Sequence, residues 1–273
     1  VITILILLIP KVTASTSSAS SYILMDSTTG RVLMSKDMHT SRLIASITKI
    51  MTATLAIESG KLDDVVEVSP IIKEAYGSGI YIEVGEEITL KDLVYGLMLR
   101  SGNDAAMMIS EYIGGTTEEF VNMMNKKAKE LGMKETTFYN PSGLPTPSGN
   151  YSSVYDMALL TKYAMNSPVY QEIVKTKTYK VTTNKKTYLW HNKNKLLKYD
   201  YITGGKTGYT EESGRTLVST ANIDNMSLIV VTIRDSDDWN THIELYNHAK
   251  DNYYAYRVLN KNKFKVYGEN YYK

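Results

Sequence analysis

A serine and a lysine three residues apart stand at the head of the first long apolar-periodic segment. Ser46 and Lys49 open it, and the segment runs to Glu58 before Gly60 ends it. In a helix this spacing puts both side chains on one face. Ser46 would then lie in the first turn, where unpaired backbone N–H groups gather. Serine becomes a nucleophile when a nearby base takes its proton, and the oxyanion that follows needs fixed N–H donors. The pair therefore indicates acyl transfer.

Two further motifs follow in order. Ser101-Gly102-Asn103 lies between two predicted helices, and Lys206-Thr207-Gly208 enters a predicted strand. Taken singly, each motif is more ordinary as a helix cap, a turn or a strand start than as a catalytic group. Taken together with Ser46 and Lys49, they match the motif set of penicillin-binding proteins and class A β-lactamases. A second Ser-Gly-Asn at 148–150 follows no helix, and we interpret it as turn chemistry.

The elements that must position these motifs alternate between strands and helices. A hairpin is predicted at 22–34 and a capping box at Thr89 and Asp92. Helices are predicted at 46–58, 89–99, 105–113, 117–131, 153–165 and 239–259, a Lys- and Tyr-rich hairpin over 177–200, and strands at 216–221 and 226–233. Strands split around a helical insertion imply two lobes that meet at a cleft. We therefore predict a two-lobed α/β fold: an antiparallel β-sheet flanked by helices, plus a mostly helical lobe over about 60–200.

Composition excludes several classes of protein. The chain has 273 residues, a formal net charge of +2 and no cysteine. That length suits one large domain or one domain of two lobes, and the balanced charge gives no nucleic-acid footprint. Without cysteine there are no disulfides, thiolate metal sites or cysteine nucleophiles. The four histidines lack metal-ligand spacing, so we predict no metal and no cofactor.

The first residues resemble the apolar core of a secretory signal peptide. Residues 1–9 are almost wholly apolar, and Val12-Thr13-Ala14 ends in an A-x-A-like site. The run is too short for a spanning helix, which needs about 20 apolar residues; a buried strand is the plainer alternative. We predict a signal-peptide remnant at 1–14, a Ser-rich linker at 15–21, a catalytic domain at 22–260 and a C-terminal tail at 261–273.

The wider sequence resembles the D-alanyl-D-alanine carboxypeptidases, which are low-molecular-mass penicillin-binding proteins of the serine peptidase type. The resemblance runs from about Ser21 to Leu259. It rests on ASITKIMTA (45–53), LRSGNDAA (99–106), NPSGL (140–144), YDMALL (155–160) and GGKTGYT (204–210). It implies the β-lactamase/DD-peptidase-like fold, with the active site in the cleft between the lobes.

The resemblance also implies catalytic roles. Ser46 would attack the carbonyl between the two terminal D-alanines of a peptidoglycan stem peptide. Lys49 would take the proton, since desolvation and the nearby Lys206 ammonium favour a neutral amine. Ser101 would relay the proton to the departing D-alanine, and Asn103 would position Lys49 or the substrate amide. Water would then hydrolyse the acyl-enzyme, and β-lactams would trap it by acylating Ser46.

The remaining implied roles concern binding. Lys206 supplies positive potential, and Thr207 hydrogen-bonds the terminal carboxylate. The strand after Thr207 pairs with the extended peptide, while Gly208 lets the backbone approach closely. Backbone N–H groups of Ser46 and Tyr209 form the oxyanion hole. The predicted partners are D-Ala-D-Ala stem peptides and β-lactams, at the outer face of a bacterial cytoplasmic membrane or in the cell-wall space, with no nucleic acid.

Some alternatives stay open. Family members commonly carry a C-terminal β-rich domain and a membrane-binding tail, so anchoring is left open here. Arg234 is the nearest candidate for a carboxylate-binding arginine and is not counted among the site residues. A class A β-lactamase needs an extra carboxylate before the third motif, and 140–150 contains no Glu or Asp. A D,D-endopeptidase would use the same residues, and a non-catalytic peptidoglycan- or penicillin-binding module is the alternative from a different class.

Overall fold

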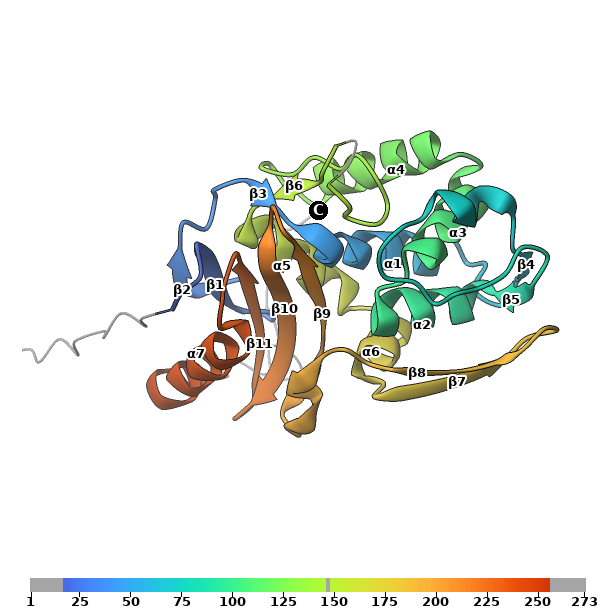
Figure 1. The fold of residues 1–273 in the computed structure, drawn as a ribbon. Helices are drawn as coiled ribbons and strands as arrows, with labels where there is room; N and C mark the ends of the chain where they lie inside the picture. The colour runs from blue at the N-terminus through green and yellow to red at the C-terminus, as the bar shows by residue number, and fades with distance from the viewer. Residues whose placement is uncertain (1–16, 146–147, 256–273) are drawn as a thin grey trace, which may run out of the picture.

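An antiparallel sheet of five strands forms one side of the molecule. The structure is a computed structural model that describes residues 17–145 and 148–255 (Figure 1). The sheet has the order β2-β1-β11-β10-β9, so the first strands of the chain pair with the last. Its strands are β1 (Ser21–Asp26), β2 (Val32–Lys36), β9 (Ile202–Thr210), β10 (Gly214–Ile223) and β11 (Met226–Ile233).

Helices cover the sheet and build the second lobe, on the right of Figure 1. The α-helices are α1 (Lys49–Glu58), α2 (Leu90–Arg100), α3 (Asn103–Gly114), α4 (Thr117–Glu130), α5 (Val154–Ala164), α6 (Pro168–Lys175) and α7 (Asp238–Asn252). Short 3₁₀ turns are η1 (Ala45–Thr48), η2 (Pro70–Glu74) and η3 (Lys195–Lys198).

Three small two-stranded ladders join these helices at the rim of the second lobe. They are β3 (Arg42–Leu43) with β6 (Tyr151–Ser152), β4 (Val65–Glu67) with β5 (Glu87–Thr89), and β7 (Thr178–Thr182) with β8 (Thr187–His191). No helix among residues 17–145 and 148–255 is long and apolar enough to cross a membrane.

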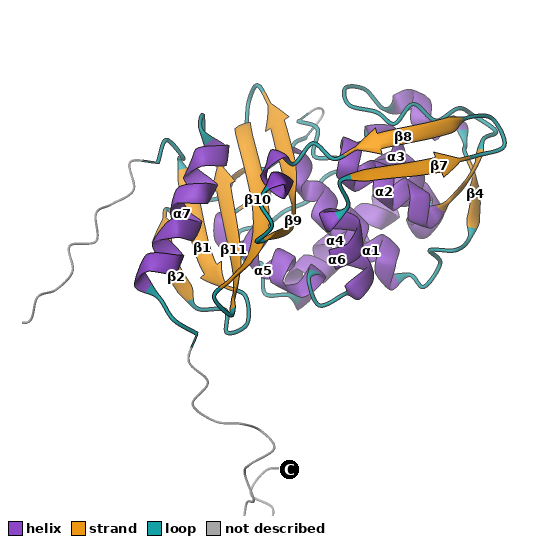
Figure 2. Cartoon of the chain, turned by 90° about the horizontal axis from the view of Figure 1, so that it is seen from below, coloured by secondary structure: helices purple, strands orange, loops and turns teal. Residues whose placement is uncertain are grey.

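The sheet buries both of its faces, because successive side chains of a strand point to opposite sides. In β1, Ile23 and Met25 join the core shared with α1 and α5, whereas Tyr22 and Leu24 join the core under α7. Figure 2 shows α7 on one face of the sheet and α5 on the other. The sheet is therefore a rigid wall, and its edge strand β9 faces the helical lobe.

The predicted two-lobed α/β fold is confirmed, with a few differences in detail. The segment expected to be helical from Ser46 begins as η1 and becomes an α-helix only at Lys49. Helix α6 was not predicted; the Ser167 side chain caps it, and Pro168 occupies its first turn. Asp104 does not cap α3 from outside. It lies in the first turn and accepts hydrogen bonds from the backbone of Ile80 and Tyr81.

The Ser-rich segment expected to be a linker is packed where the structure describes it. Ser21 starts β1, Ala19 is buried, and Ser18 hydrogen-bonds Asp235 at 2.5 Å. The backbone N–H of Ser20 extends the ladder toward β11. Strand pairing therefore begins inside the segment that its composition marked as unstructured. The predicted signal-peptide remnant at 1–14 and tail at 261–273 lie outside the described residues.

Candidate active site

The turn that carries Ser46 is held tightly from three sides. Ala45, just before it, has a φ of +48°, a conformation that costs a non-glycine residue energy and persists where the surroundings enforce it. A Cβ on Gly143 would lie 1.9 Å from the Ala45 carbonyl oxygen, so only glycine fits beneath the turn. The Thr216 hydroxyl donates to the Ile44 carbonyl at 3.0 Å. The nucleophile therefore sits on a fixed backbone.

Gly208 of β9 packs directly against the same turn. A Cβ there would lie 2.9 Å from the Ser46 nitrogen and 2.4 Å from Thr216 Oγ1. The missing side chain lets the edge strand come close to the first turn of the helix. This close approach opens the space in front of Ser46 to an extended peptide chain.

Lys49 Nζ has three polar neighbours, and their chemistry fixes what the amine can do. It lies 2.7 Å from Asn103 Oδ1, 2.5 Å from the Ser142 carbonyl oxygen and 3.0 Å from Ser46 Oγ. The first two atoms only accept hydrogen bonds. In a neutral amine they engage both N–H groups, and the lone pair is left for the Ser46 hydroxyl proton. The arrangement suits a general base.

The amide of Asn103 has a fixed orientation. Its nitrogen donates to the Tyr76 carbonyl at 2.6 Å, and its backbone N–H donates to the Ser78 carbonyl. The oxygen must therefore face Lys49. Ser101, two residues earlier, ends α2 in the left-handed conformation with a φ of 64°. This conformation turns the chain sharply between two helices and buries the hydroxyl.

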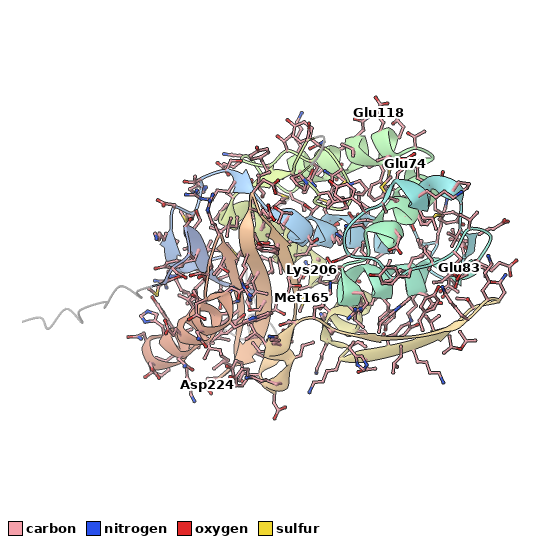
Figure 3. All side chains as sticks on the ribbon, viewed as in Figure 1. Glu74, Glu83, Glu118, Met165, Lys206 and Asp224 are labelled. Atoms are coloured by element: carbon pink, nitrogen blue, oxygen red, sulfur yellow. The ribbon has the colours of Figure 1, made fainter. Side chains whose placement is uncertain are left out.

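Lys206 is the second buried amine, and Figure 3 shows it between the sheet and the helical lobe. It is 1% exposed, and its Nζ donates to Ser101 Oγ at 3.0 Å and to the Thr207 carbonyl at 2.6 Å. Burial lowers its pKa well below the usual range, and the positive charges of Lys49 and Lys193 add to the shift. The bond to Ser101 links the second and third sequence motifs.

Desolvation also governs Lys49. Burial, helped by the nearby Lys193 ammonium and opposed by the Asp104 carboxylate, lowers the pKa of Lys49 to about 7. A substantial fraction of this amine is therefore neutral near pH 7, as a general base requires.

A cleft of about 480 Å³ opens in front of these groups. Its walls include Ser46, Ser101, Thr207, Gly208 and Tyr209. Lys49, Asn103 and Lys206 lie behind this wall and are almost fully buried. The structure thus brings together all eight residues expected from the sequence. Lys49 is surrounded by hydrogen-bond acceptors and lies within reach of the Ser46 hydroxyl. Lys206, the second amine, is bound to the Ser101 hydroxyl. These are the parts that an acyl-transfer site needs.

Comparison with known proteins agrees with this geometry. The family model for D-alanyl-D-alanine carboxypeptidase, peptidase S11, matches residues 10–237. The chain belongs to this family. DacF of Bacillus subtilis is 44% identical over 224 residues, which are 78% of this chain and 56% of DacF. DacD of Escherichia coli is 32% identical over 90% of this chain and 66% of its own length. The chain therefore spans just over half of one relative and just under two thirds of the other.

Solved structures of the carboxypeptidase family and its neighbours share the fold. A D-alanyl-D-alanine carboxypeptidase from Mycobacterium tuberculosis superposes with a TM-score of 0.81 at 28% identity, covering 85% of this chain and 90% of that one. A serine-to-alanine mutant of the Streptomyces K15 DD-transpeptidase gives 0.80 at 29% identity, covering 86% and 100%. Peptidase S11 members and a transpeptidase thus share one scaffold with this chain.

Sequence reasoning missed five residues that line the cleft. They are Ser78, Lys193, Arg215, Asp238 and Trp239. Lys193 Nζ donates to Ser78 Oγ at 3.1 Å. The guanidinium of Arg215 binds Asp238 Oδ1 at 2.5 and 3.1 Å and lies 5.6 Å from the Trp239 ring centroid. Among the described residues that line the cleft, Arg215 is the arginine; Arg234 is not in the lining.

The family motif NPSGL at 140–144 acts here through its backbone. The Ser142 carbonyl accepts from Lys49, and the Pro141 carbonyl accepts from Thr52 Oγ1. Asn150, in the second Ser-Gly-Asn, is buried; its amide donates to Thr48 Oγ1 and its oxygen accepts from the 139–140 backbone. The second Ser-Gly-Asn therefore stabilises the loop, as expected for a turn, and links that loop to the turn that carries Ser46.

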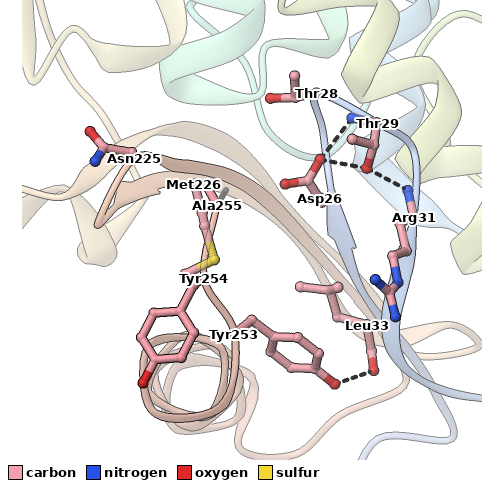
Figure 4. Close-up of a pocket in the computed structure, with 10 residues that line it drawn as sticks. All are labelled: Asp26, Thr28, Thr29, Arg31, Leu33, Asn225, Met226, Tyr253, Tyr254 and Ala255. Atoms are coloured by element: carbon pink, nitrogen blue, oxygen red, sulfur yellow. Dashed lines mark hydrogen bonds between the residues drawn. The ribbon is translucent and has the colours of Figure 1, made fainter. Parts of the chain in front are cut away.

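A larger cavity of about 780 Å³ lies elsewhere and carries no comparable chemistry (Figure 4). It lies between the β1–β2 turn, the β10–β11 turn and the chain after α7. Two of its polar side chains are bound within the lining: Asp26 accepts from Thr29, and Tyr253 donates to the Leu33 carbonyl. Among the described residues that line it, no hydroxyl is paired with a lysine or histidine base. Chemistry rather than size therefore identifies the site.

Proposed function

We propose that this chain is a serine D,D-carboxypeptidase that removes the terminal D-alanine from peptidoglycan stem peptides and is acylated by β-lactams. The observation that carries the proposal is the environment of Lys49. Its Nζ lies 3.0 Å from Ser46 Oγ, while two carbonyl-type oxygens engage its N–H groups. A pKa of about 7 keeps much of it neutral.

In the acylation step, the Ser46 oxygen bonds to the carbonyl carbon of the penultimate D-alanine and its proton passes to Lys49. The oxyanion would accept hydrogen bonds from the backbone N–H groups of Ser46 and Tyr209. When the C–N bond breaks, the amine of the last D-alanine takes a proton from the Ser101 hydroxyl. Lys206, 3.0 Å from that hydroxyl, replaces it.

Before deacylation, the proton held by Lys49 passes to the Lys206 amine, which has given one up, so that Lys49 is neutral again. In the deacylation step, water then attacks the ester carbon and gives a proton to Lys49, which returns it to the departing Ser46 oxygen. Thr207 would hydrogen-bond the substrate carboxylate, and the negative charge of that carboxylate would favour the protonated form of Lys206, which then adds positive potential. The outer edge of β9 would pair with the extended peptide, since β9 is the last strand of the sheet. Asn103 would position Lys49 through its amide oxygen.

The cellular setting follows from the substrate. A peptidoglycan-processing enzyme acts outside the cytoplasm, so we place this one at the outer face of a bacterial cytoplasmic membrane or in the cell-wall space. The apolar run at 1–9, followed by Ala14, fits export by a signal peptide.

The test measures D-alanine released from a soluble peptide ending in D-Ala-D-Ala. The matched control is Ser46→Ala, which removes one oxygen and keeps the other hydrogen bonds of Lys49. Release by the wild-type chain that is lost in the control establishes the proposed reaction. Lys49→Met should lose it as well, because the base is gone while the volume is kept.

Other outcomes identify the alternatives. Catalytic hydrolysis of benzylpenicillin without release of D-alanine would make the chain a β-lactamase. A stable penicilloyl ester on Ser46 with cleavage only of cross-linked dimers would make it an endopeptidase. Transfer to an added amine without hydrolysis would make it a transpeptidase, and binding without any covalent adduct a non-catalytic module.

A further inference from the structure

One segment of the chain concentrates positive charge. Residues 173–199 contain eight lysines and neither Asp nor Glu, although the whole chain has a formal net charge of only +2. The remainder is therefore net acidic. The segment comprises the end of α6, the β7–β8 hairpin and η3, and it leads directly into β9. Such segregation creates a local positive potential that the net charge conceals.

The hairpin has one buried and one exposed face. Tyr179 stacks on Tyr95 of α2 with ring centroids 3.6 Å apart, and Trp190 is buried beside it. The opposite face consists of the cross-strand pairs Thr178 with His191, Lys180 with Leu189, and Thr182 with Thr187. Figure 2 shows the hairpin lying across α2 with this outer side uncovered. No carboxylate lies on the exposed face.

The eight lysines of the segment differ in the contacts that they make. At the tip, Lys186 pairs with Glu83 at 2.6 Å and Lys185 donates to the Val84 carbonyl. These two lysines hold a neighbouring loop and are already engaged. Of the other six lysines, Lys193 donates to Ser78, and Lys198 Nζ lies 4.9 Å from the Tyr199 ring centroid. The remaining four are exposed and make no side-chain hydrogen bond, ion pair or cation–π contact with any residue that the structure describes. This group, the basic hairpin surface, consists of Lys175, Lys177, Lys180 and Lys195.

The basic hairpin surface adjoins the active-site cleft. Strand β8 ends at His191, and Lys193, two residues later, lines the cleft together with Ser46. Lys195 follows two residues further along, at the start of η3. Positive charge therefore continues from the cleft onto the outer surface.

We propose that the basic hairpin surface binds carboxylates of the peptidoglycan strand whose stem peptide occupies the cleft. This inference rests on the proposed function. Uncross-linked peptidoglycan presents free carboxylates at repeated intervals along a polymer, and the free lysines are complementary to it. A lipid surface fits less well, because membrane docking inserts apolar side chains and Leu189 is the only large exposed hydrophobic residue in β7 and β8.

The consequence is a preference for polymeric over short substrates. An exposed lysine–carboxylate contact changes affinity by about two-fold, and salt screens it. Four contacts together give the polymer an advantage of roughly ten-fold at low ionic strength. A short peptide whose only charged group is its terminal carboxylate reaches the cleft but not the hairpin, and it gains nothing.

The experiment compares D-alanine release from insoluble uncross-linked peptidoglycan and from that short peptide, at 50 and 500 mM NaCl (about 14 and 4 Å screening length). The test variant carries Lys175→Gln, Lys177→Gln, Lys180→Gln and Lys195→Gln. The matched control carries Lys126→Gln, Lys129→Gln, Lys134→Gln and Lys250→Gln, which remove the same charge from exposed positions elsewhere. Both should keep the wild-type melting temperature.

We expect the test variant to lose roughly ten-fold on the polymer at low salt and to keep its rate on the short peptide. At high salt, the rate of D-alanine release from the polymer by the wild-type chain should fall to that of the test variant. The control variant should behave as the wild type does at both salt concentrations. Equal polymer rates for all three chains would overturn the inference, as would equal losses in both variants. Binding of the wild-type surface to anionic lipid vesicles but not to peptidoglycan would overturn it in favour of a membrane. If the short peptide itself is not cleaved, the proposed function fails instead.

Discussion

The amide oxygen of Asn103 lies 2.7 Å from Lys49 Nζ, and the other end of the same amide is held by the Tyr76 carbonyl. A neutral acceptor is therefore fixed against an amine that must lose its proton. A carboxylate of the same shape would hold the same position but favour the ammonium form, because an opposite charge raises the pKa of an amine.

In Asn103→Asp, the new carboxylate should therefore form an ion pair with a protonated Lys49, which can no longer act as a base. We expect acylation by a β-lactam at pH 7 to fall by about 100-fold and to recover in part as the pH rises. Asn103→Ala removes the acceptor without adding charge; it should lose about 10-fold without a shift toward alkaline pH. Stopped-flow acylation rates across pH 6–10 distinguish the two. Equal pH profiles for both variants would contradict the assigned role of Asn103.

Lys193 should change the pKa of the general base Lys49 without making a hydrogen bond to it. Its positive charge lowers the pKa of both Lys49 and Lys206. In the wild type, acylation should rise with pH through about 7 as Lys49 loses its proton. Lys193→Gln removes the neighbouring charge, so the pKa of Lys49 rises, the midpoint moves to higher pH and the rate at pH 7 falls.

The control for this prediction is Lys195→Gln, which removes an exposed lysine two residues away. It should leave the midpoint for a soluble β-lactam unchanged. A shift of the same size in Lys195→Gln would mean that general surface charge, rather than the position of Lys193 in the cleft, sets the pH profile.

Local signals were sufficient to predict much of the fold. Helices α2, α4 and α5 begin where Thr89, Thr116 and Ser153 accept hydrogen bonds from backbone N–H groups three residues on. A helix cap is a hydrogen bond between residues close together in the sequence, so it can be predicted from the sequence alone. The three catalytic motifs are equally local, and their order along the chain is enough to group them.

The missed parts of the site depend on tertiary structure. Ser142 contributes a backbone carbonyl, which every residue has, so no side-chain pattern marks it. Arg215 reaches the cleft because it is paired with Tyr209 across the β9–β10 ladder, whereas Arg234 lies just beyond β11. Lys193 is indistinguishable in sequence from the lysines around it, and only the path of the chain after β8 separates it from them.

The close contact under the nucleophile turn should be sensitive to a single methyl group. Gly143 has a φ of +84° and would place a Cβ 1.9 Å from the Ala45 carbonyl oxygen. Gly143→Ala must therefore move either the Ser46 turn or the loop that carries the Ser142 carbonyl. We expect acylation to fall at least about 10-fold, because near-attack geometry tolerates little displacement.

Gly132 provides a control that distinguishes the cost of backbone strain from the cost of a steric clash. Gly132 has a φ of +75°, and nothing lies within 4 Å of the position that a Cβ would take there. Gly132→Ala therefore carries only the backbone cost of about 1 kcal/mol. Denaturant titration should show a clearly larger loss for Gly143→Ala, and only that variant should lose acylation. Equal stability losses, with acylation intact in both, would show that the turn is not held from below.

The buried His242 should make the free energy of unfolding depend on pH in the acid range. It is fully buried, with Nδ1 2.6 Å from Ser219 Oγ and Nε2 3.1 Å from Thr232 Oγ1. Burial lowers the pKa of His242 to about 3, from an ordinary value of 6.5. Below pH 6.5 the unfolded chain takes up a proton that the folded chain refuses, so the free energy of unfolding falls until about pH 3, by up to about 1.4 kcal/mol per pH unit.

His242→Gln keeps a hydrogen-bonding side chain that does not titrate. Its absolute stability should be lower because the packing changes, but its free energy of unfolding should fall less steeply between pH 6.5 and 4 than that of the wild type. His191→Gln, which removes an exposed imidazole on β8, should keep the wild-type slope. Urea titrations at half-unit pH intervals measure all three slopes. A wild-type slope in His242→Gln would mean that other groups, such as the buried carboxylates, control acid unfolding.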